Sequence, residues 1–298
     1  MIIPTHLQIE PINGVCTARC TMCAFPTWTR KPYRMTQRDF KTILEKFLPY
    51  CDHLQYLSLQ GFGESLLDEM LVGKVALAKF MGFKGIGFAT NCSELSWKKS
   101  KELLEAGLDT LICSVDGLTP ETHEAIRIGL NLDKILKNIL WFMLQRTLGG
   151  SRAKVIIRFI KQKSNIHEWE QFKWWWEKQI DPSYGDQVVS FDIVDCEGKV
   201  KDYKDKDVLG DVDVPCVCDQ LYSRMIVLSN GDVALCCADD NGRFNIGNVL
   251  ESDPIEIYNG EVFTRYRRLM EEGRIGELEL CNTCTIPRSQ MMKDKVGE

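Results

Sequence analysis

Cys16, Cys20 and Cys23 constrain this chain more than any other feature, because they place three thiols in one short loop, with three residues and then two between them. Four thiolates complete the ligand set of an iron–sulfur cluster, so three that stand together without a fourth indicate a cluster with one iron open to another ligand. A short strand that alternates Leu7 and Ile9 with polar residues comes just before the loop. The sequence therefore predicts a metal cluster at the end of the first strand.

Up to residue 193, the chain alternates short apolar strands with amphipathic helices. Strands are expected at residues 7–9, 54–60, 85–89, 110–115, 155–160 and 188–193. Helices are expected at residues 36–48, 68–80, 96–106, 120–127, 132–143 and 165–179. Thr36 is a typical N-cap residue, and Gly107 suits the left-handed position that commonly ends a helix. The repeated units predict a parallel sheet with right-handed crossovers, in which the strand at 155–160 is covered on both faces.

Residues 197–213 are dense in charges of both signs, which is typical of a solvated connector. We therefore divide the chain into three parts. Residues 1–196 form the large domain, residues 197–214 form a charged linker, and residues 215–298 form a smaller domain.

The last part of the chain combines a β-hairpin, a helix and spaced cysteines. Asn230-Gly231 lies between the apolar stretches 225–228 and 233–235 and predicts a tight hairpin. A helix is expected over residues 261–272. The cysteines that flank these elements are Cys218, Cys236, Cys281 and Cys284. This arrangement predicts a compact unit that is stabilised by a metal bound to these cysteines.

Further segments just past the predicted strands extend the pattern of the cysteine loop. They are Gly61-Phe62-Gly63-Glu64, Thr90-Asn91, Ser114-Val115-Asp116-Gly117 and the nearby Arg127. With the cysteine loop, they resemble the radical S-adenosylmethionine (radical SAM) superfamily. The resemblance implies an α/β fold, a (β/α)6 partial TIM-like barrel with its chemistry at the carboxyl ends of the strands. It also implies a 4Fe–4S cluster held by Cys16, Cys20 and Cys23, whose open iron takes the amine and carboxylate of S-adenosyl-L-methionine (SAM).

The same resemblance implies which residues contact SAM. The segment Gly61, Phe62, Gly63 and Glu64 corresponds to a Gly-Gly-Glu motif, in which the glycines admit the ligand and the carboxylate accepts bonds from the methionyl ammonium. Asn91 belongs to a Thr-Asn pair at the end of the third strand. Met22 is expected beside the adenine. The ribose and carboxylate of SAM are expected near Ser114, Asp116 and Arg127.

The C-terminal cysteines resemble the SPASM/twitch extension of radical SAM enzymes. Because the cysteine series stops after Cys284, the resemblance implies the twitch form, with one auxiliary 4Fe–4S cluster and a BtrN-like architecture. Its expected ligands are Cys218, Cys236, Cys281 and Cys284. Cys216 could replace Cys218, and Cys237 could replace Cys236. A structural zinc ion bound by four thiolates is the alternative for this site.

Charge and composition exclude several classes of protein. The formal net charge is −5 and no basic cluster offers a broad phosphate-binding face, which argues against nucleic acid as a partner. No apolar run approaches the ~20 residues that cross a bilayer, and the start of the chain lacks the features of a signal peptide. The 13 cysteines therefore point to metal or redox chemistry. We expect a cytoplasmic enzyme without a membrane partner.

These features predict a radical SAM enzyme that receives an electron from an external reductant such as flavodoxin or ferredoxin. It would cleave SAM to a 5′-deoxyadenosyl radical, which abstracts a hydrogen atom from the substrate. Four thiolates leave the auxiliary cluster no open iron, so we expect it to accept an electron, which makes the net reaction an oxidation of a small molecule. One alternative is a maturase that epimerises or crosslinks a ribosomally made peptide. The alternative of another class is a zinc-stabilised, non-catalytic binding module.

Overall fold

The computed structural model describes residues 1–193 and 217–284, which are built around an eight-stranded sheet. The strands lie in the order β10-β9-β1-β3-β4-β5-β7-β8. Their bounds are β1 (His6–Ile9), β3 (Tyr56–Leu59), β4 (Ile86–Thr90), β5 (Thr110–Ser114), β7 (Lys154–Lys161), β8 (Gln187–Asp192), β9 (Arg224–Val227) and β10 (Val233–Ala234). Strands β1, β3, β4, β5, β7 and β8 pair in parallel with their neighbours, which confirms the predicted partial barrel.

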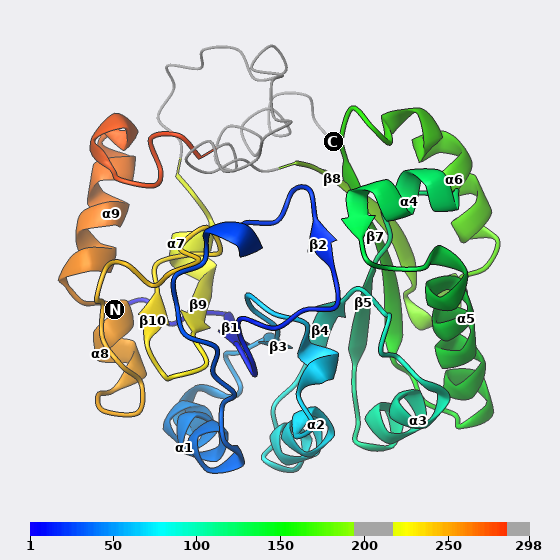
Figure 1. Ribbon diagram of the computed structural model, residues 1–298. Coiled ribbons are helices and arrows are strands. Elements are labelled where there is room, and N and C mark those ends of the chain that lie inside the picture. The colour runs from blue at the N-terminus through cyan, green and yellow to red at the C-terminus, as the bar shows by residue number, and fades with distance from the viewer. Residues whose placement is uncertain (194–216, 285–298) are drawn as a thin grey trace.

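Helices cover the outer side of the curved sheet (Figure 1). They are α1 (Gln37–Phe47), α2 (Leu71–Phe80), α3 (Trp97–Glu105), α4 (Pro120–Ile126), α5 (Leu132–Leu148), α6 (Trp169–Glu177), α7 (Gln220–Ser223), α8 (Pro254–Tyr258) and α9 (Glu261–Glu271). Thr36 caps α1 as predicted, because its hydroxyl accepts a hydrogen bond from the backbone N–H of Asp39 at 3.0 Å. No helix in the described residues is both long and apolar enough to span a bilayer.

Strand β7 differs from the expectation that both of its faces are covered. Val155, Ile157 and Phe159 are fully buried in the core under the helices. The residues between them, among them Arg158, are only partly buried. Successive side chains of a strand point to opposite faces, so one face of β7 packs on the helices and the other lines the inside of the barrel. That inner face is only partly buried by the described residues.

The C-terminal hairpin joins the sheet of the barrel. β9 pairs in parallel with β1, with His6 opposite Arg224 and Ile9 opposite Val227, and β10 pairs antiparallel with β9. Figure 1 shows β9 and β10 beside β1, with α8 and α9 packed outside them. The hairpin therefore continues the sheet of the barrel. The division into residues 1–196, 197–214 and 215–298 remains a prediction. The predicted linker at 197–214 lies outside the described residues.

Candidate functional site

The cysteine loop crosses the carboxyl ends of the strands and is held there by a short second sheet. β2 (Arg19–Cys20) pairs antiparallel with β6 (Arg127–Ile128), which places Cys20 opposite Arg127. One terminal nitrogen of Arg127 lies 3.7 Å from the sulfur of Cys20. Nothing in the sequence indicated this pairing, because each partner strand has only two residues and they lie far apart in the chain. The pairing brings a positive charge to the first cysteine cluster.

The three loop thiols lie close enough together to affect one another. Burial raises the pKa of Cys16, Cys20 and Cys23, and that of Cys23 rises to about 11. The other two thiols raise the pKa of Cys23 further, because neighbouring thiolates repel. A bound cation would relieve this repulsion, so the donor set fits an iron–sulfur cluster. In the described ranges, no three His, Cys, Asp or Glu side chains converge tightly enough to hold a single metal ion.

Glu64 links the end of β3 to the end of β4 by hydrogen bonds. Its buried carboxylate accepts hydrogen bonds from the Thr90 hydroxyl at 2.6 Å, from the Asn91 N–H at 2.9 Å and from the Leu66 N–H at 3.1 Å. Burial raises the pKa of Glu64, and these donors oppose that rise. Both oxygens are thus engaged by the protein itself. The predicted contact of Glu64 with the SAM ammonium remains a prediction.

Asn91 links the end of β4 to the cysteine loop. Its amide nitrogen donates to the Thr17 hydroxyl at 2.9 Å and lies 3.7 Å from the sulfur of Cys16. Its amide oxygen accepts from the N–H of Ser93 at 2.9 Å. The predicted residues Glu64 and Asn91 and the first cysteine cluster are therefore joined in one network.

Glu10 is a site residue that our sequence analysis missed. Its fully buried carboxylate binds both terminal nitrogens of Arg30 at 2.8 Å and also accepts from the N–H groups of Phe62 at 2.8 Å and Ser229 at 2.9 Å. Gly61 lies so close that an added Cβ would stand 2.4 Å from Cγ of Glu10. A charged residue directly after an apolar strand was the signal that could have revealed it.

Three predicted residues meet at the ends of β5 and β7. Asp116 is fully buried, accepts from the N–H of Ile160 at 2.7 Å and forms a 2.7 Å ion pair with Arg127. The hydroxyl of Ser114 accepts from Arg158 at 2.6 Å. Arg158 was not predicted, because nothing in the spacing of β7 singles it out.

Phe62 reaches from the glycine segment to the C-terminal hairpin. It packs against a small apolar cluster formed by Ile226, Leu228, Ala234 and the partly buried Cys237. The ring of Trp28 meets it edge to face, with centroids 5.7 Å apart. Met22 lies within the cysteine loop and is partly buried.

The structure brings the four predicted C-terminal thiols together. Burial raises the pKa of Cys218 and of Cys281 to about 12, and each is raised further by the nearby Cys284. Burial raises the pKa of Cys236 well above its usual value, and the nearby thiols of Cys237, Cys281 and Cys284 raise it further. Cys237 lies close to Cys218, Cys236 and Cys284 and also packs on the apolar cluster around Phe62. Cys216 lies outside the described residues.

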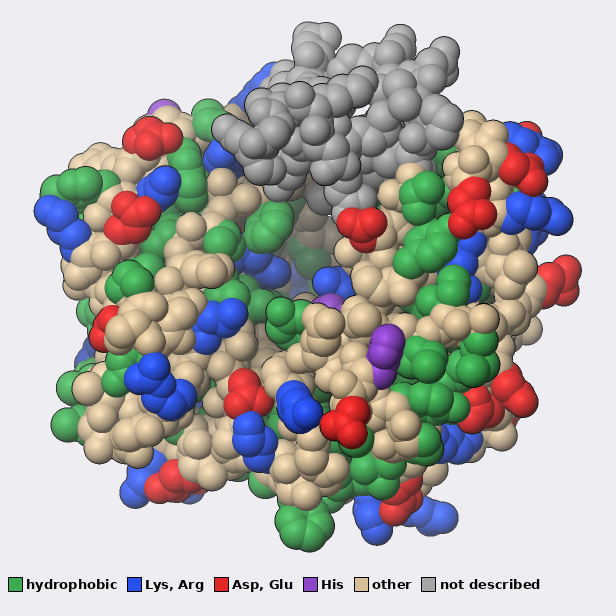
Figure 2. Space-filling model, turned by 180° about the vertical axis from the view of Figure 1, so that it is seen from behind, with side chains coloured by type: hydrophobic (Ala, Val, Ile, Leu, Met, Phe, Trp, Pro, Cys, Tyr) green, Lys and Arg blue, Asp and Glu red, His purple; other side chains and the backbone are tan. Residues whose placement is uncertain are grey.

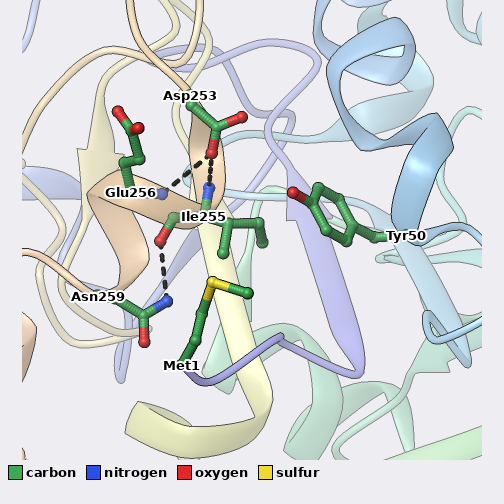
Figure 3. A pocket seen from close by; sticks show the side chains of 6 residues that line it. All are labelled: Met1, Tyr50, Asp253, Ile255, Glu256 and Asn259. Atoms are coloured by element: carbon green, nitrogen blue, oxygen red, sulfur yellow. Dashed lines mark hydrogen bonds between the residues drawn. The ribbon is translucent and has the colours of Figure 1, made fainter.

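A separate hollow of ≈ 600 Å³ lies beside the start of the chain and α8. It is lined by Met1, Tyr50, Asp253, Ile255, Glu256 and Asn259 (Figure 3). Asp253 caps α8 by accepting from two backbone N–H groups, and Asn259 bonds to the backbone of Ile2 and Ile255. These polar groups serve the local structure, and none of the predicted site residues lines this hollow.

Two family profiles match the chain. Residues 11–143 match the radical SAM superfamily, and residues 216–285 match the SPASM iron-sulfur cluster-binding domain. A radical SAM domain implies SAM and a 4Fe–4S cluster, and a SPASM domain implies auxiliary iron–sulfur clusters.

Among the curated proteins that match parts of this chain are the following two. A tungsten-containing aldehyde ferredoxin oxidoreductase cofactor-modifying protein of Pyrococcus furiosus is 26% identical over 55% of this chain and 45% of its own length. An S-adenosyl-L-methionine-dependent 2-deoxy-scyllo-inosamine dehydrogenase of Niallia circulans is 32% identical over 20% of this chain and 24% of its own length. The chain thus spans less than half the length of these relatives.

Solved structures share the fold over nearly the whole chain. BtrN in complex with AdoMet and 2-DOIA has a TM-score of 0.61 and 18% identity, covering 95% of this chain and 93% of BtrN. Streptococcus suis SuiB bound to the precursor peptide SuiA has a TM-score of 0.61 and 14% identity, covering 97% and 71%. Native anSMEcpe with bound AdoMet has a TM-score of 0.68 and 16% identity, covering 90% and 84%.

Proposed function

We propose that this chain, which belongs to the radical SAM superfamily and carries a SPASM iron–sulfur cluster-binding domain, oxidises a small molecule by hydrogen-atom abstraction. One observation carries the proposal: two groups of neighbouring thiols lie on one barrel, one in the loop at the strand ends and one around the end of the adjoining hairpin. When bound, SAM and the first cluster supply a 5′-deoxyadenosyl radical that removes a hydrogen atom, and the auxiliary cluster supplies an acceptor for the electron that remains.

The residues of the cysteine loop are proposed to hold the first cluster. Cys16, Cys20 and Cys23 offer three thiolates, and Arg127 places its positive charge beside them. Asp116 fixes Arg127 through the 2.7 Å ion pair. The segments at the ends of β3, β4 and β5 are proposed to bind and orient SAM above the inside of the barrel, where the substrate is shielded from water.

The C-terminal thiols are proposed to hold one auxiliary cluster. Four ligands, Cys218, Cys236, Cys281 and Cys284, would leave no iron open to the substrate. Such a cluster would act by electron transfer, and its potential depends on its surroundings within the range that iron–sulfur proteins span. This argument favours a net two-electron oxidation, such as dehydrogenation or crosslinking. Thiols that must stay reduced favour a cytosolic location and a reductant such as flavodoxin or ferredoxin.

A small alcohol or aminocyclitol is the proposed substrate class. The match to a SAM-dependent 2-deoxy-scyllo-inosamine dehydrogenase and the shared fold with BtrN, crystallised with 2-DOIA, support it. A ribosomally made peptide is the second candidate. The shared fold with SuiB, crystallised with its precursor peptide, favours that reading.

Iron and labile sulfide per chain, measured after anaerobic purification, test the proposal. We expect about eight irons in the wild type and about four in a variant with Cys16, Cys20 and Cys23 changed to Ala. A Cys51→Ala variant is the matched control, since Cys51 lies after α1 and belongs to neither thiol cluster. If the wild type instead contains about four irons and the triple variant contains none, the chain holds no auxiliary cluster. That outcome would favour a redox-neutral reaction. Zinc without iron would support a non-catalytic binding module.

SAM turnover tests the oxidative outcome separately. The proposal requires that one SAM is consumed for each substrate oxidised. Continued turnover with SAM regenerated unchanged would contradict it.

A further inference from the structure

Arg224 is the first residue of β9 and lies on the face of that strand that meets the C-terminal thiols. Met225 and Val227 are fully buried in the main core, so Arg224 and Ile226 point to the other face of the strand. Ile226 packs there in the small apolar cluster that includes Cys237. Because β10 runs antiparallel to β9, the cysteines that follow β10 return toward the start of β9. Arg224 and the C-terminal thiols therefore lie on the same side of the hairpin.

His6, which is opposite Arg224 on β1, holds the guanidinium in place. Nε of Arg224 donates to Nδ1 of His6 at 3.1 Å, and Nε2 of His6 lies 2.6 Å from the hydroxyl of Ser58. Because the Nε of arginine always carries a hydrogen, Nδ1 accepts it, and the ring proton is on Nε2, which donates to Ser58. Burial, with a smaller effect of Arg224, lowers the pKa of His6 to about 3, so the ring stays neutral in this role.

The charge of Arg224 is not neutralised by any acid in the described part of the chain. Within residues 1–193 and 217–284, its side chain bonds to His6, and no Asp or Glu forms an ion pair with it. Its two terminal nitrogens donate to none of those residues. Seen from behind, the molecule is hollowed below the grey atoms, and Lys or Arg and His side chains lie together there (Figure 2). The nearby thiols are the groups that can supply negative charge to Arg224.

Arg224 supplies the opposite charge to that of the groups around the C-terminal thiols. Burial raises the pKa of Cys237, and the charge of Arg224 opposes that rise. The other charges that act most strongly on the C-terminal thiols, among the described residues, come from neighbouring thiols and from Asp219, and all of these are negative. A charge near buried groups acts more strongly than it does in water. The one cation in these surroundings therefore has a large effect on any negative charge held by the thiols.

We propose that Arg224, positioned by His6, raises the reduction potential of the auxiliary cluster and so favours its reduction. The inference rests on the proposed function. In the proposed oxidation, the substrate radical loses one electron to the auxiliary cluster and one proton to solvent, so the site formed by the C-terminal thiols gains one negative charge. A fixed cation beside the thiols stabilises that added charge, and the charges around an iron–sulfur cluster help to set its potential.

The reduction potential can be measured without turnover, by anaerobic redox titration of the full chain followed by electron paramagnetic resonance. The signal that persists in the variant with Cys16, Cys20 and Cys23 changed to Ala identifies the auxiliary cluster. We expect Arg224→Gln to lower its potential by about 59 mV or more, which is about tenfold in the equilibrium constant for a one-electron reduction. Arg224→Lys keeps the charge but not the Nε–H that His6 accepts, so its shift is smaller. An unchanged potential in Arg224→Gln overturns the proposal.

Matched variants separate the effect of this charge from other effects of substitution. Arg268→Gln is the control, because Arg268 is exposed on α9 and pairs with Glu272, so the potential should stay at the wild-type value. An equal shift in both variants would contradict a specific role of Arg224. If Arg224→Gln does not retain the auxiliary iron, His6→Phe replaces it. This variant keeps a flat ring and the charge of Arg224 but removes the acceptor that fixes it.

We expect His6→Phe to lower the same equilibrium constant by about threefold, because the guanidinium can then turn away from the thiols. An unchanged potential in His6→Phe contradicts the proposal. The results also separate this inference from the proposed function. A wild type without a second iron signal defeats both. If the potential falls in Arg224→Gln but SAM is regenerated unchanged during turnover, the proposed oxidation is wrong and the role of Arg224 stands.

Discussion

Arg30 donates both of its terminal nitrogens to the carboxylate of Glu10, one to each oxygen, at 2.8 Å. The same carboxylate accepts the N–H groups of Phe62 and Ser229, and the Nε atom of Arg30 donates to the carbonyl of Asp240. The pair therefore joins the end of β1, the segment after the cysteine loop, the glycine segment and the C-terminal hairpin. This buried ion pair therefore links the segment after the cysteine loop to the C-terminal hairpin.

Glu10→Gln should lower the free energy of unfolding by about 3 kcal/mol or more, because Arg30 then keeps a buried charge without a counter-ion. Urea unfolding followed by tryptophan fluorescence measures the change. Glu105→Gln is the control, because it removes an exposed ion pair with Lys101 and should cost less than about 1 kcal/mol. Equal effects of the two variants would show that the Glu10 pair stabilises the fold no more than an exposed pair does.

Gly61→Ala should destabilise the protein by about 1–3 kcal/mol and weaken SAM binding. The new Cβ would lie 2.4 Å from Cγ of Glu10, and that side chain is held by Arg30 and two backbone donors, so it cannot yield. Gly73→Ala is the matched control. Gly73 lies in α2 with its nearest neighbour, Gln37, at 3.6 Å, so alanine there should stabilise by about 0.5–1 kcal/mol. Thermal melting and equilibrium dialysis with SAM compare the two.

Cys236→Ala should lower the iron content from about eight to about four per chain, whereas Cys237→Ala should retain it. Cys236 lies among the thiols of Cys281 and Cys284, while Cys237 packs on the apolar cluster with Phe62. Iron and sulfide analysis of both variants decides between them. If only Cys237→Ala lost iron, Cys237 and not Cys236 would be the cluster ligand.

His123→Asn should reduce the loss of stability in acid. His123 is fully buried, its Nδ1 accepts from the N–H of Asp116 at 3.2 Å, and burial, with a smaller effect of Arg127, lowers its pKa to about 3. The pKa of His123 in the folded protein lies below its pKa in the unfolded chain, so the free energy of unfolding keeps its full value above about pH 6.5. Between about pH 6.5 and 3 it falls by about 1.4 kcal/mol per pH unit, because only the unfolded state binds the proton there.

Asparagine keeps an acceptor for the Asp116 N–H and does not titrate. Urea unfolding at about pH 7, 6 and 5 should therefore show a shallower slope for His123→Asn than for wild type. His167→Asn, at an exposed position, reports the effect of removing a histidine as such. Parallel slopes for wild type and His123→Asn would mean that the buried imidazole does not control the acid response.

The sequence alone predicted the strands, the helices and the two sets of cysteines. These features depend on local rules: the period of apolar residues, the capping of α1 by Thr36, the Asn230-Gly231 turn, and the spacing of Cys16, Cys20 and Cys23. Each rule relates residues that lie a few positions apart, so it can be read from a short stretch. The identity of the thiols that bind each cluster remains a prediction from the same spacing.

Only the tertiary structure decided which charged residues meet. Arg127 reaches Cys20 through a two-residue ladder, Glu10 pairs with Arg30, and Arg158 faces the inside of the barrel. These contacts join segments whose own patterns carry no sign of the partner. A buried charge must find its counter-ion wherever the fold brings one close, so the pairing is a property of the assembled strands and of no single segment.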